Sequence, residues 1–127
     1  MSSLSRVGDP VARGFAAVGA VFAALAVAGA AYASHGLSGE AQARLSIAAA
    51  FAFGHGVALL ALLHRCQSRL QRLGLLALVL GVLLFSGSLA AAALFHGTTR
   101  FAPLGGGLLI LAWLYLAVVL VLPQPRE

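Results

Sequence analysis

Residues Leu73–Phe95, LGLLALVLGVLLFSGSLAAAALF, lie in the longest stretch of the chain without a charged side chain. A helix that crosses the hydrocarbon core of a bilayer needs about 20 mostly apolar residues, so this segment is long enough to span a membrane. Near its middle lie the small and polar residues of Phe85-Ser86-Gly87-Ser88-Leu89. Such residues favour contacts with other helices over contacts with lipid chains. The segment is therefore predicted to be the central span of a helical membrane protein.

The composition extends this prediction to the whole chain. Of its 127 residues, 61% are hydrophobic and 9% are charged, whereas soluble domains carry about 25% charged residues. The apolar segments predict spans at about 14–34, 43–63, 73–95 and 102–122. Four crossings take up about 80 residues, so we expect residues 1–127 to form a single integral membrane domain. The predicted fold class is all-α, a four-helix transmembrane bundle with short loops.

The first apolar segment also fits a secretory signal, because Arg6 and Arg13 precede it and Ala31-Tyr32-Ala33 matches a cleavage pattern. The segment is longer than the apolar core of about 7–15 residues in such signals, so we expect it to be retained as a span.

Small residues predict where the helices touch. In the first span, Ala16, Ala20, Ala24 and Ala28 recur every four residues and so share one helix face. We expect this face to contact another helix inside the bundle, with general alanine richness as the alternative. Glycines let helix backbones approach closely in lipid. The predicted helix-packing glycines are Gly29, Gly87, Gly105 and Gly106.

The charges predict orientation. The net charge is +5, from eight arginines against Asp9, Glu40 and Glu127. Short gaps between spans hold these arginines, which suits membrane topology and lipid headgroups better than nucleic acid, so no nucleic-acid partner is expected. One side of the membrane would carry six of them (Arg6, Arg13, Arg65, Arg69, Arg72, Arg126), and the other side two (Arg44, Arg100). Because arginine favours the cytoplasmic side, we predict cytoplasmic N and C termini in the bacterial inner membrane.

Four motifs in series resemble a known family. Gly29–Leu37 (GAAYASHGL) is similar to GAFGAHGL, His55–Leu60 (HGVALL) to HALALL, and Leu84–Leu89 (LFSGSL) to LFSGSLY. Ala102–Gly106, followed by Leu111-Ala112-Trp113, is similar to TPIGG…LGW. In this order they resemble the small membrane proteins called domain of unknown function 423, whose animal relatives are named transmembrane protein 256.

The resemblance implies four membrane helices and no established activity, substrate or cofactor. Three positions depart from the family pattern: Phe51 and Ala90 stand where the family has Tyr, and Ala102 where it has Thr. Any role that needs those hydroxyl groups is in doubt here.

Helical rise predicts a polar layer near the bilayer centre. At about 1.5 Å per residue, His55 lies about 16 Å and Ser86 about 15 Å from the outer ends of their helices. Ser88 and Trp113 fall at similar depth, so we predict a mid-membrane polar layer of these four side chains. Polar groups in lipid need partners, and an ionisable one is a functional candidate. The alternative is a neutral His55 in a structural hydrogen bond.

His35 and His96 are predicted to form a polar cluster at the outer surface. The histidines differ too much in depth from His55 to share one ion, so no metal and no cofactor are expected. The single cysteine, Cys66, excludes an intramolecular disulfide. No acidic residue lies within the membrane to orient a serine–histidine pair, and we therefore expect no enzyme.

Two functions remain at this point. The first is a non-enzymatic membrane component that acts through helix packing with itself or with partner membrane proteins. The second is a small oligomeric transporter or channel that uses the polar layer around His55. A continuous polar path would favour the second function, and a dry, filled core the first.

Overall fold

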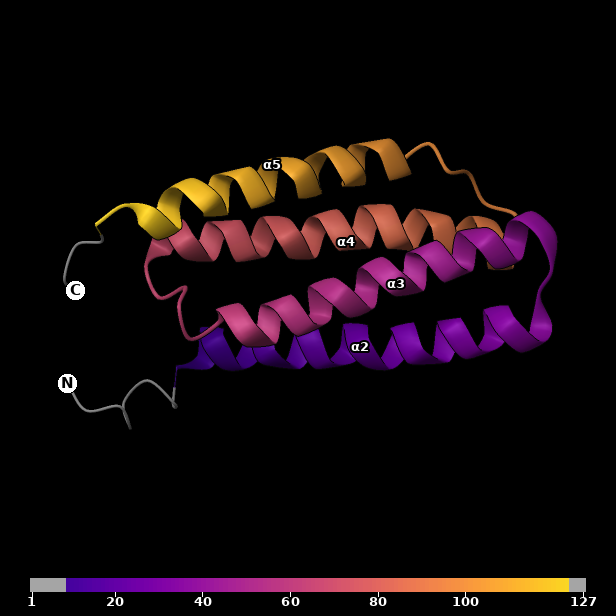
Figure 1. Cartoon of the computed structure of the whole chain (residues 1–127), viewed down its shortest axis with the longest axis horizontal. Coiled ribbons are helices and arrows are strands. Elements are labelled where there is room, and N and C mark those ends of the chain that lie inside the picture. Colours follow the sequence, from indigo (N-terminus) through magenta and orange to yellow (C-terminus); the bar gives the residue numbers. More distant parts are fainter. Residues whose placement is uncertain (1–8, 124–127) are drawn as a thin grey trace.

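The computed structural model describes residues 9–123 and contains four helices and no strands in that range (Figure 1). The helices are α2 (Pro10–Gly36), α3 (Gly39–Leu62), α4 (Arg69–Phe95) and α5 (Ala102–Val121). Each is long and apolar enough to cross a membrane. The predicted all-α fold with four spans is therefore confirmed.

The helix starts extend beyond the apolar segments because polar side chains cap them. The carboxylate of Asp9 accepts a hydrogen bond of 3.0 Å from the backbone N–H of Val11, and Pro10 follows at a position where no N–H is needed. At the start of α4, Ser68 and Gln71 form a reciprocal capping box. α2 and α4 consequently begin in the polar sequence that precedes each apolar segment.

The turn before α3 and the turn after α4 each contain a residue in the left-handed backbone conformation. Gly39 starts α3 with φ of 61°, and His96 ends α4 with φ of 56°; only the first is a glycine, for which this conformation carries no steric penalty. After His96, the chain folds back along α4, so that the carbonyl oxygen of Thr98 accepts a bond of 3.0 Å from the Ser88 hydroxyl. His35 lies in the last turn of α2, which continues to Gly36 and so extends past the predicted end of the first span at about residue 34.

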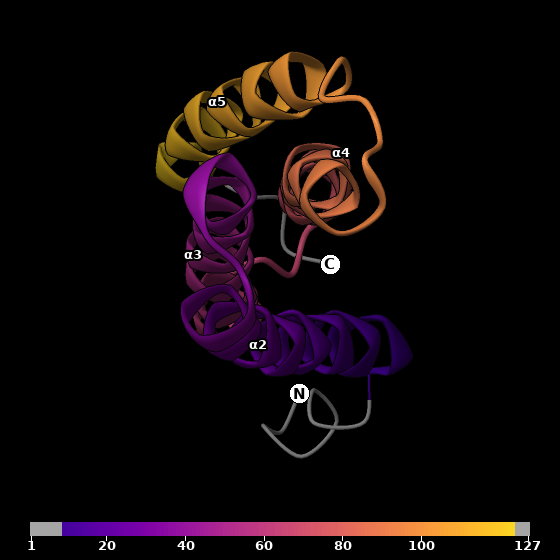
Figure 2. The same cartoon turned by 90° about the vertical axis from the view of Figure 1, so that its right-hand side faces the viewer.

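Consecutive helices run antiparallel to each other (Figure 1). The substantial contacts join neighbours in the chain: α2 to α3, α3 to α4, and α4 to α5. α2 and α5 lie at opposite edges in both views, so the arrangement is open on one side (Figure 2). The starts of α2 and α4 and the ends of α3 and α5 share one end of the molecule, which we call the inner end. The other is the outer end.

The main core lies where α3, α4 and α5 meet. Its fully buried side chains are Leu59, Leu75, Leu78, Leu116 and Cys66. A smaller core near the outer end contains Ala33, Leu45 and Ala93. The burial of Cys66 shows that the loop between α3 and α4 is anchored in the core rather than lying on its surface.

Glycines set the closest helix contacts. A methyl group added to Gly19 would lie 2.6 Å from the carbonyl oxygen of Gly56, and one added to Gly56 would lie 2.6 Å from that of Gly19. This crossing of α2 and α3 was not predicted. The predicted contact at Gly105 is present, because an added Cβ there would collide with the backbone of Phe85 in α4.

The other predicted glycines differ from one another. Cβ atoms on Gly29 and Gly106 would make ordinary contacts, at 3.6 Å from Leu45 and 3.5 Å from Phe85. Gly87 is exposed, and nothing lies within 4 Å of an added Cβ, so it does not make the predicted helix contact. It lies instead in the lining of a groove between α2, α3 and α4.

The predicted alanine face of α2 was also wrong. Ala20, Ala24 and Ala28 are exposed, and Ala16 is half-buried. The buried stripe consists of Gly19, Phe22, Ala26 and Ala33. A four-residue spacing identifies residues that share a face, but it does not identify which face meets the neighbouring helix.

We predict that Gly105→Ala lowers the free energy of unfolding in detergent micelles by about 1–3 kcal/mol, because the added methyl overpacks the α4–α5 contact. Gly107→Ala is the matched control, since nothing lies within 4 Å of its Cβ position, and it should cause no loss. Titration with a denaturing detergent measures both. Equal effects of the two substitutions would contradict the close contact.

Candidate functional site

His55 is the ionisable side chain at the centre of the predicted polar layer, and it is 9% exposed. Its Nδ1 lies 2.8 Å from the carbonyl oxygen of Phe51, and its Nε2 lies 3.1 Å from the indole Nε1 of Trp113. An indole N–H only donates and a carbonyl only accepts. Nδ1 therefore carries the proton and Nε2 accepts, which defines a neutral ring with both nitrogens bonded.

Aromatic rings surround this histidine. Phe51 stacks on it with ring centroids 6.0 Å apart, and Trp113 lies tilted with a centroid distance of 5.8 Å. Phe85 contacts Phe51 at 4.7 Å. We call these four residues the His55 cluster. It joins α3, α4 and α5, and Phe51 and Trp113 are each about 40% exposed, so one side of the cluster faces outward.

Sequence reasoning missed Phe51 and Phe85. Phe51 precedes His55 by four residues, and this spacing places two side chains on one helix face. Phe85 opens the polar segment of the central span. A search for aromatic residues one turn from the histidine, and at equal depth on the next helix, would have found both.

The two serines of the predicted layer bond elsewhere. The Ser86 hydroxyl donates to the carbonyl oxygen of Ala48 in α3 at 2.9 Å. Ala48 precedes His55 by seven residues, about 10 Å along the helix. Ser88 donates to Thr98. The structure thus brings His55 and Trp113 together and gives Ser86 and Ser88 separate partners toward the outer end.

His35 and His96, the predicted outer cluster, lie at the same end of the molecule but do not bond to each other. Both side chains are exposed, one in the last turn of α2 and one at the end of α4. Within residues 9–123 no hydrogen bond joins them, and no group of three or more His, Cys, Asp or Glu residues could hold a metal ion. Nearby, Glu40 and Arg44 form an exposed ion pair.

An apolar groove of about 170 Å³ opens between α2, α3 and α4. Small residues line much of it, among them Ala26, Gly29, Ala48 and Gly87, and Ser86 contributes the described hydroxyl. Since that hydroxyl already donates to Ala48, the groove presents apolar surface with one polar oxygen at its edge.

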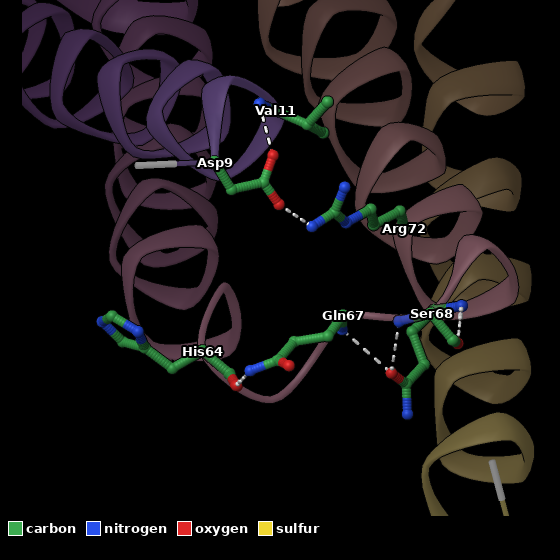
Figure 3. A network of polar contacts seen from close by, with 7 residues as sticks. Asp9, Val11, His64, Gln67, Ser68 and Arg72 are labelled. Atoms are coloured by element: carbon green, nitrogen blue, oxygen red, sulfur yellow. Dashed lines mark hydrogen bonds and ion pairs between the residues drawn. The ribbon is translucent and has the colours of Figure 1, made fainter. Parts of the chain in front are cut away.

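A network of polar contacts lies at the inner end (Figure 3). The carboxylate of Asp9 pairs with Arg72 and so links the start of α2 to α4. The Arg72 side chain, through this hydrogen bond, holds the pKa of Asp9 below its ordinary value of 3.8. Tyr115 adds a second link, from α5 to α4, by donating to the carbonyl oxygen of Leu70 at 2.7 Å.

The α3–α4 loop is held by glutamines. The side-chain oxygen of Gln71 accepts the backbone N–H groups of Gln67 and Ser68 at 3.0 and 3.2 Å. The side-chain amide of Gln67 donates to the carbonyl oxygen of His64 at 2.8 Å (Figure 3). Burial raises the pKa of the Cys66 thiol, which keeps it protonated and unreactive at neutral pH. Nothing in this loop forms a nucleophilic site.

The sequence model of a family described as "Protein of unknown function (DUF423)" matches residues 29–106. The matched part begins with the last two turns of α2 and ends in the first turns of α5. No curated protein and no solved structure matches the chain.

We predict that His55 and Trp113 are energetically coupled. His55→Leu, Trp113→Phe and the double variant form a cycle whose coupling free energy should be about 0.6–2 kcal/mol, the range for hydrogen bonds between membrane helices. Because Trp113 is the single tryptophan, its fluorescence emission should also shift to shorter wavelength in His55→Leu. A coupling energy of zero with unchanged emission would contradict the bond.

We predict that Asp9→Asn destabilises the protein at neutral pH and that this difference disappears in acid. Asn still caps the helix, so the variant isolates the ion pair with Arg72. The pKa of Asp9 is lower in the folded than in the unfolded chain, so its contribution is complete above the ordinary value and is lost as pH falls through the folded value. Unfolding free energies measured from pH 7 to acid test this. A difference that persists unchanged below the ordinary pKa would contradict the pairing.

Proposed function

The chain belongs to the family of proteins of unknown function DUF423, and we propose that this member is a non-enzymatic multi-pass component of the bacterial inner membrane. It acts by packing its helices against a second copy or against a partner membrane protein. The proposal rests on which parts of its surface suit lipid and which suit another helix.

One observation carries the proposal. A shallow groove on the α2–α3 pair has Val27 and Phe53 at its border and includes four exposed small residues, Ala30 and Ser34 from α2 and Ser46 and Ala50 from α3. We call these four residues the small-residue face. Small side chains permit close approach of another helix in lipid, and serine hydroxyls can bond across such a contact.

The outward side of α5 provides the contrast. Its most exposed side chains are large and aliphatic, with Ile110, Leu111 and Leu114 between 61% and 65% exposed. Such side chains are well solvated by lipid chains. The small-residue face is therefore better suited to a protein contact than the outward side of α5 is.

The polar side chains support a role without chemistry. His55 is bonded at both nitrogens, and Ser86 and Ser88 each donate to a backbone carbonyl. A transporter or channel, the second candidate, needs polar groups that can exchange protein partners for solute or water. Breaking the His55 bonds would leave its nitrogens unpaired in lipid, so we place this function second.

The orientation is part of the proposal. At the inner end lie Arg13, Arg65, Arg69 and Arg72, whereas the outer end has Arg44 and Arg100. By the positive-inside rule, the inner end faces the cytoplasm, and so do both termini.

Cysteine cross-linking in native membranes tests the proposed contact. In a Cys66→Ala background, Ala50→Cys places a thiol on the small-residue face and Leu114→Cys places one on the lipid-suited side of α5. We predict cross-linked dimers, or adducts with another membrane protein, for Ala50→Cys at several times the yield for Leu114→Cys. Copurification in mild detergent with mass spectrometry then identifies the species.

The outcomes separate the versions of the proposal. Dimers of the chain support self-association, and adducts with one other protein support a partner. Equal yields at both positions, or no product at either, would contradict a role through this face. Copurified small solutes that disappear in His55→Leu would instead favour the transporter.

A further inference from the structure

Three arginines at the inner end have no ion-pair partner among residues 9–123. Asp9 is the only acidic side chain described there, and it already forms an ion pair with Arg72. Within residues 9–123, Arg13, Arg65 and Arg69 make no ion pair, and all three are exposed. This end therefore has an excess of positive charge that the described part of the chain does not neutralise.

The outer end differs. Arg44 pairs with Glu40, and the guanidinium of Arg100 lies over the ring of Phe101, 5.7 Å from its centroid, in a cation–π contact. Each outer arginine thus already has a partner within the chain. The two ends differ in available positive charge as well as in the number of arginines.

The α3–α4 loop holds two of the free arginines outward. Cys66 between them is 2% exposed and anchors the loop in the core. The Gln71 oxygen fixes the backbone of Gln67 and Ser68. Arg65 and Arg69 are exposed on either side of this anchor, with Cα atoms at most about 15 Å apart by chain length. Their backbone positions are consequently set before any ligand binds.

The start of α4 adds a second source of positive potential. Ser68 caps the N–H of Gln71, and that of Arg72 bonds to the carbonyl oxygen of Ser68. The N–H groups of Arg69 and Leu70 have no acceptor among the described residues. Free N–H groups in a first helical turn, together with the helix dipole, favour a bound anion such as phosphate.

We propose that Arg65, Arg69 and the first turn of α4 form a binding site for the phosphate of an anionic phospholipid headgroup. Arg72 is excluded from this site because it holds Asp9. Guanidinium groups suit phosphate through paired N–H donors, and their aliphatic stems can lie along the adjoining apolar surface.

The position of the site favours lipid over an acidic protein. The loop contains only residues 63–68 between two helices that can cross the membrane. Its side chains therefore lie where headgroups lie, at the boundary of the hydrocarbon layer. An acidic protein would have to enter this layer, whereas headgroup phosphates are already present at that depth.

Lipid enrichment in nanodiscs tests the site. The full chain is placed in nanodiscs of mixed phosphatidylcholine and phosphatidylglycerol, and native mass spectrometry measures the lipids that remain bound. Each arginine near a membrane surface contributes about fivefold to the affinity for anionic lipid. We expect Arg65→Gln/Arg69→Gln to lower the preference for phosphatidylglycerol by up to about 30-fold, with helix content and oligomeric state unchanged.

The matched control is Arg44→Gln/Arg100→Gln, which removes the same charge from the outer end and should retain the preference. High salt should weaken the preference of the unmodified chain, whereas inorganic phosphate at matched ionic strength should leave it unchanged. Equal loss in the two double variants would overturn the proposal, as would displacement by phosphate. So would binding of polyglutamate that depends on Arg65 and Arg69 while lipid enrichment does not.

Discussion

The constraint on which this structure depends is that the hydrocarbon core of a bilayer offers no water to bond with polar groups. The backbone N–H and C=O groups find their hydrogen-bond partners within four continuous helices. The polar side chains within the spans find theirs in three ways. Ser86 bonds to a carbonyl of the neighbouring helix, Ser88 to the loop that folds back beside it, and His55 to both its own helix and Trp113. These bonds require particular helix depths and rotations, so the polar residues determine the register in which α3, α4 and α5 lie. His55 in particular is held neutral by its two partners, since one of them only accepts and the other only donates.

Glycine sets the distances within that register. In lipid, apolar side chains gain little by meeting one another, so helix pairs are stabilised by close packing. The Gly19–Gly56 crossing brings two backbones together, and Gly105 does the same for α5 and α4. These contacts are pairwise along the chain, which explains why α2 and α5 remain at opposite edges. α2 is thus held by one helix along its length and, at its start, by the bond between Asp9 and Arg72. The open side and the exposed small residues are two consequences of the same sequential packing.

The sequence alone was sufficient for the features that depend on composition and length. Apolar length predicts the four helices, and helical rise predicts that His55 and Trp113 lie at one level. Which face of a helix contacts its neighbour was not predictable in the same way. Ala20, Ala24 and Ala28 have the spacing of contact residues, yet they are exposed, because spacing is equally compatible with every rotation of the helix. Likewise, Ser86 and Ser88 have the right depth but point to other partners. A rotation is selected by the whole set of neighbours, and here the Gly19–Gly56 and Gly105–Phe85 contacts select it.

The number of arginines at one end of the molecule differs from the number that are available to bind a ligand. For orientation, all arginines near a span act together, because each opposes transfer across the membrane. For binding, only those without an internal partner are available, and the structure divides them: Arg72 neutralises Asp9, Arg44 pairs with Glu40, and Arg100 lies over Phe101. Among the described residues Arg13, Arg65 and Arg69 remain. The last two flank a loop whose backbone N–H groups at Gln67 and Ser68 are bonded to Gln71. A loop that needed water or lipid to satisfy its backbone would change shape with its surroundings. Because Gln71 bonds the backbone of Gln67 and Ser68 and Cys66 is buried in the core, Arg65 and Arg69 can interact with headgroups without first requiring this loop to become ordered.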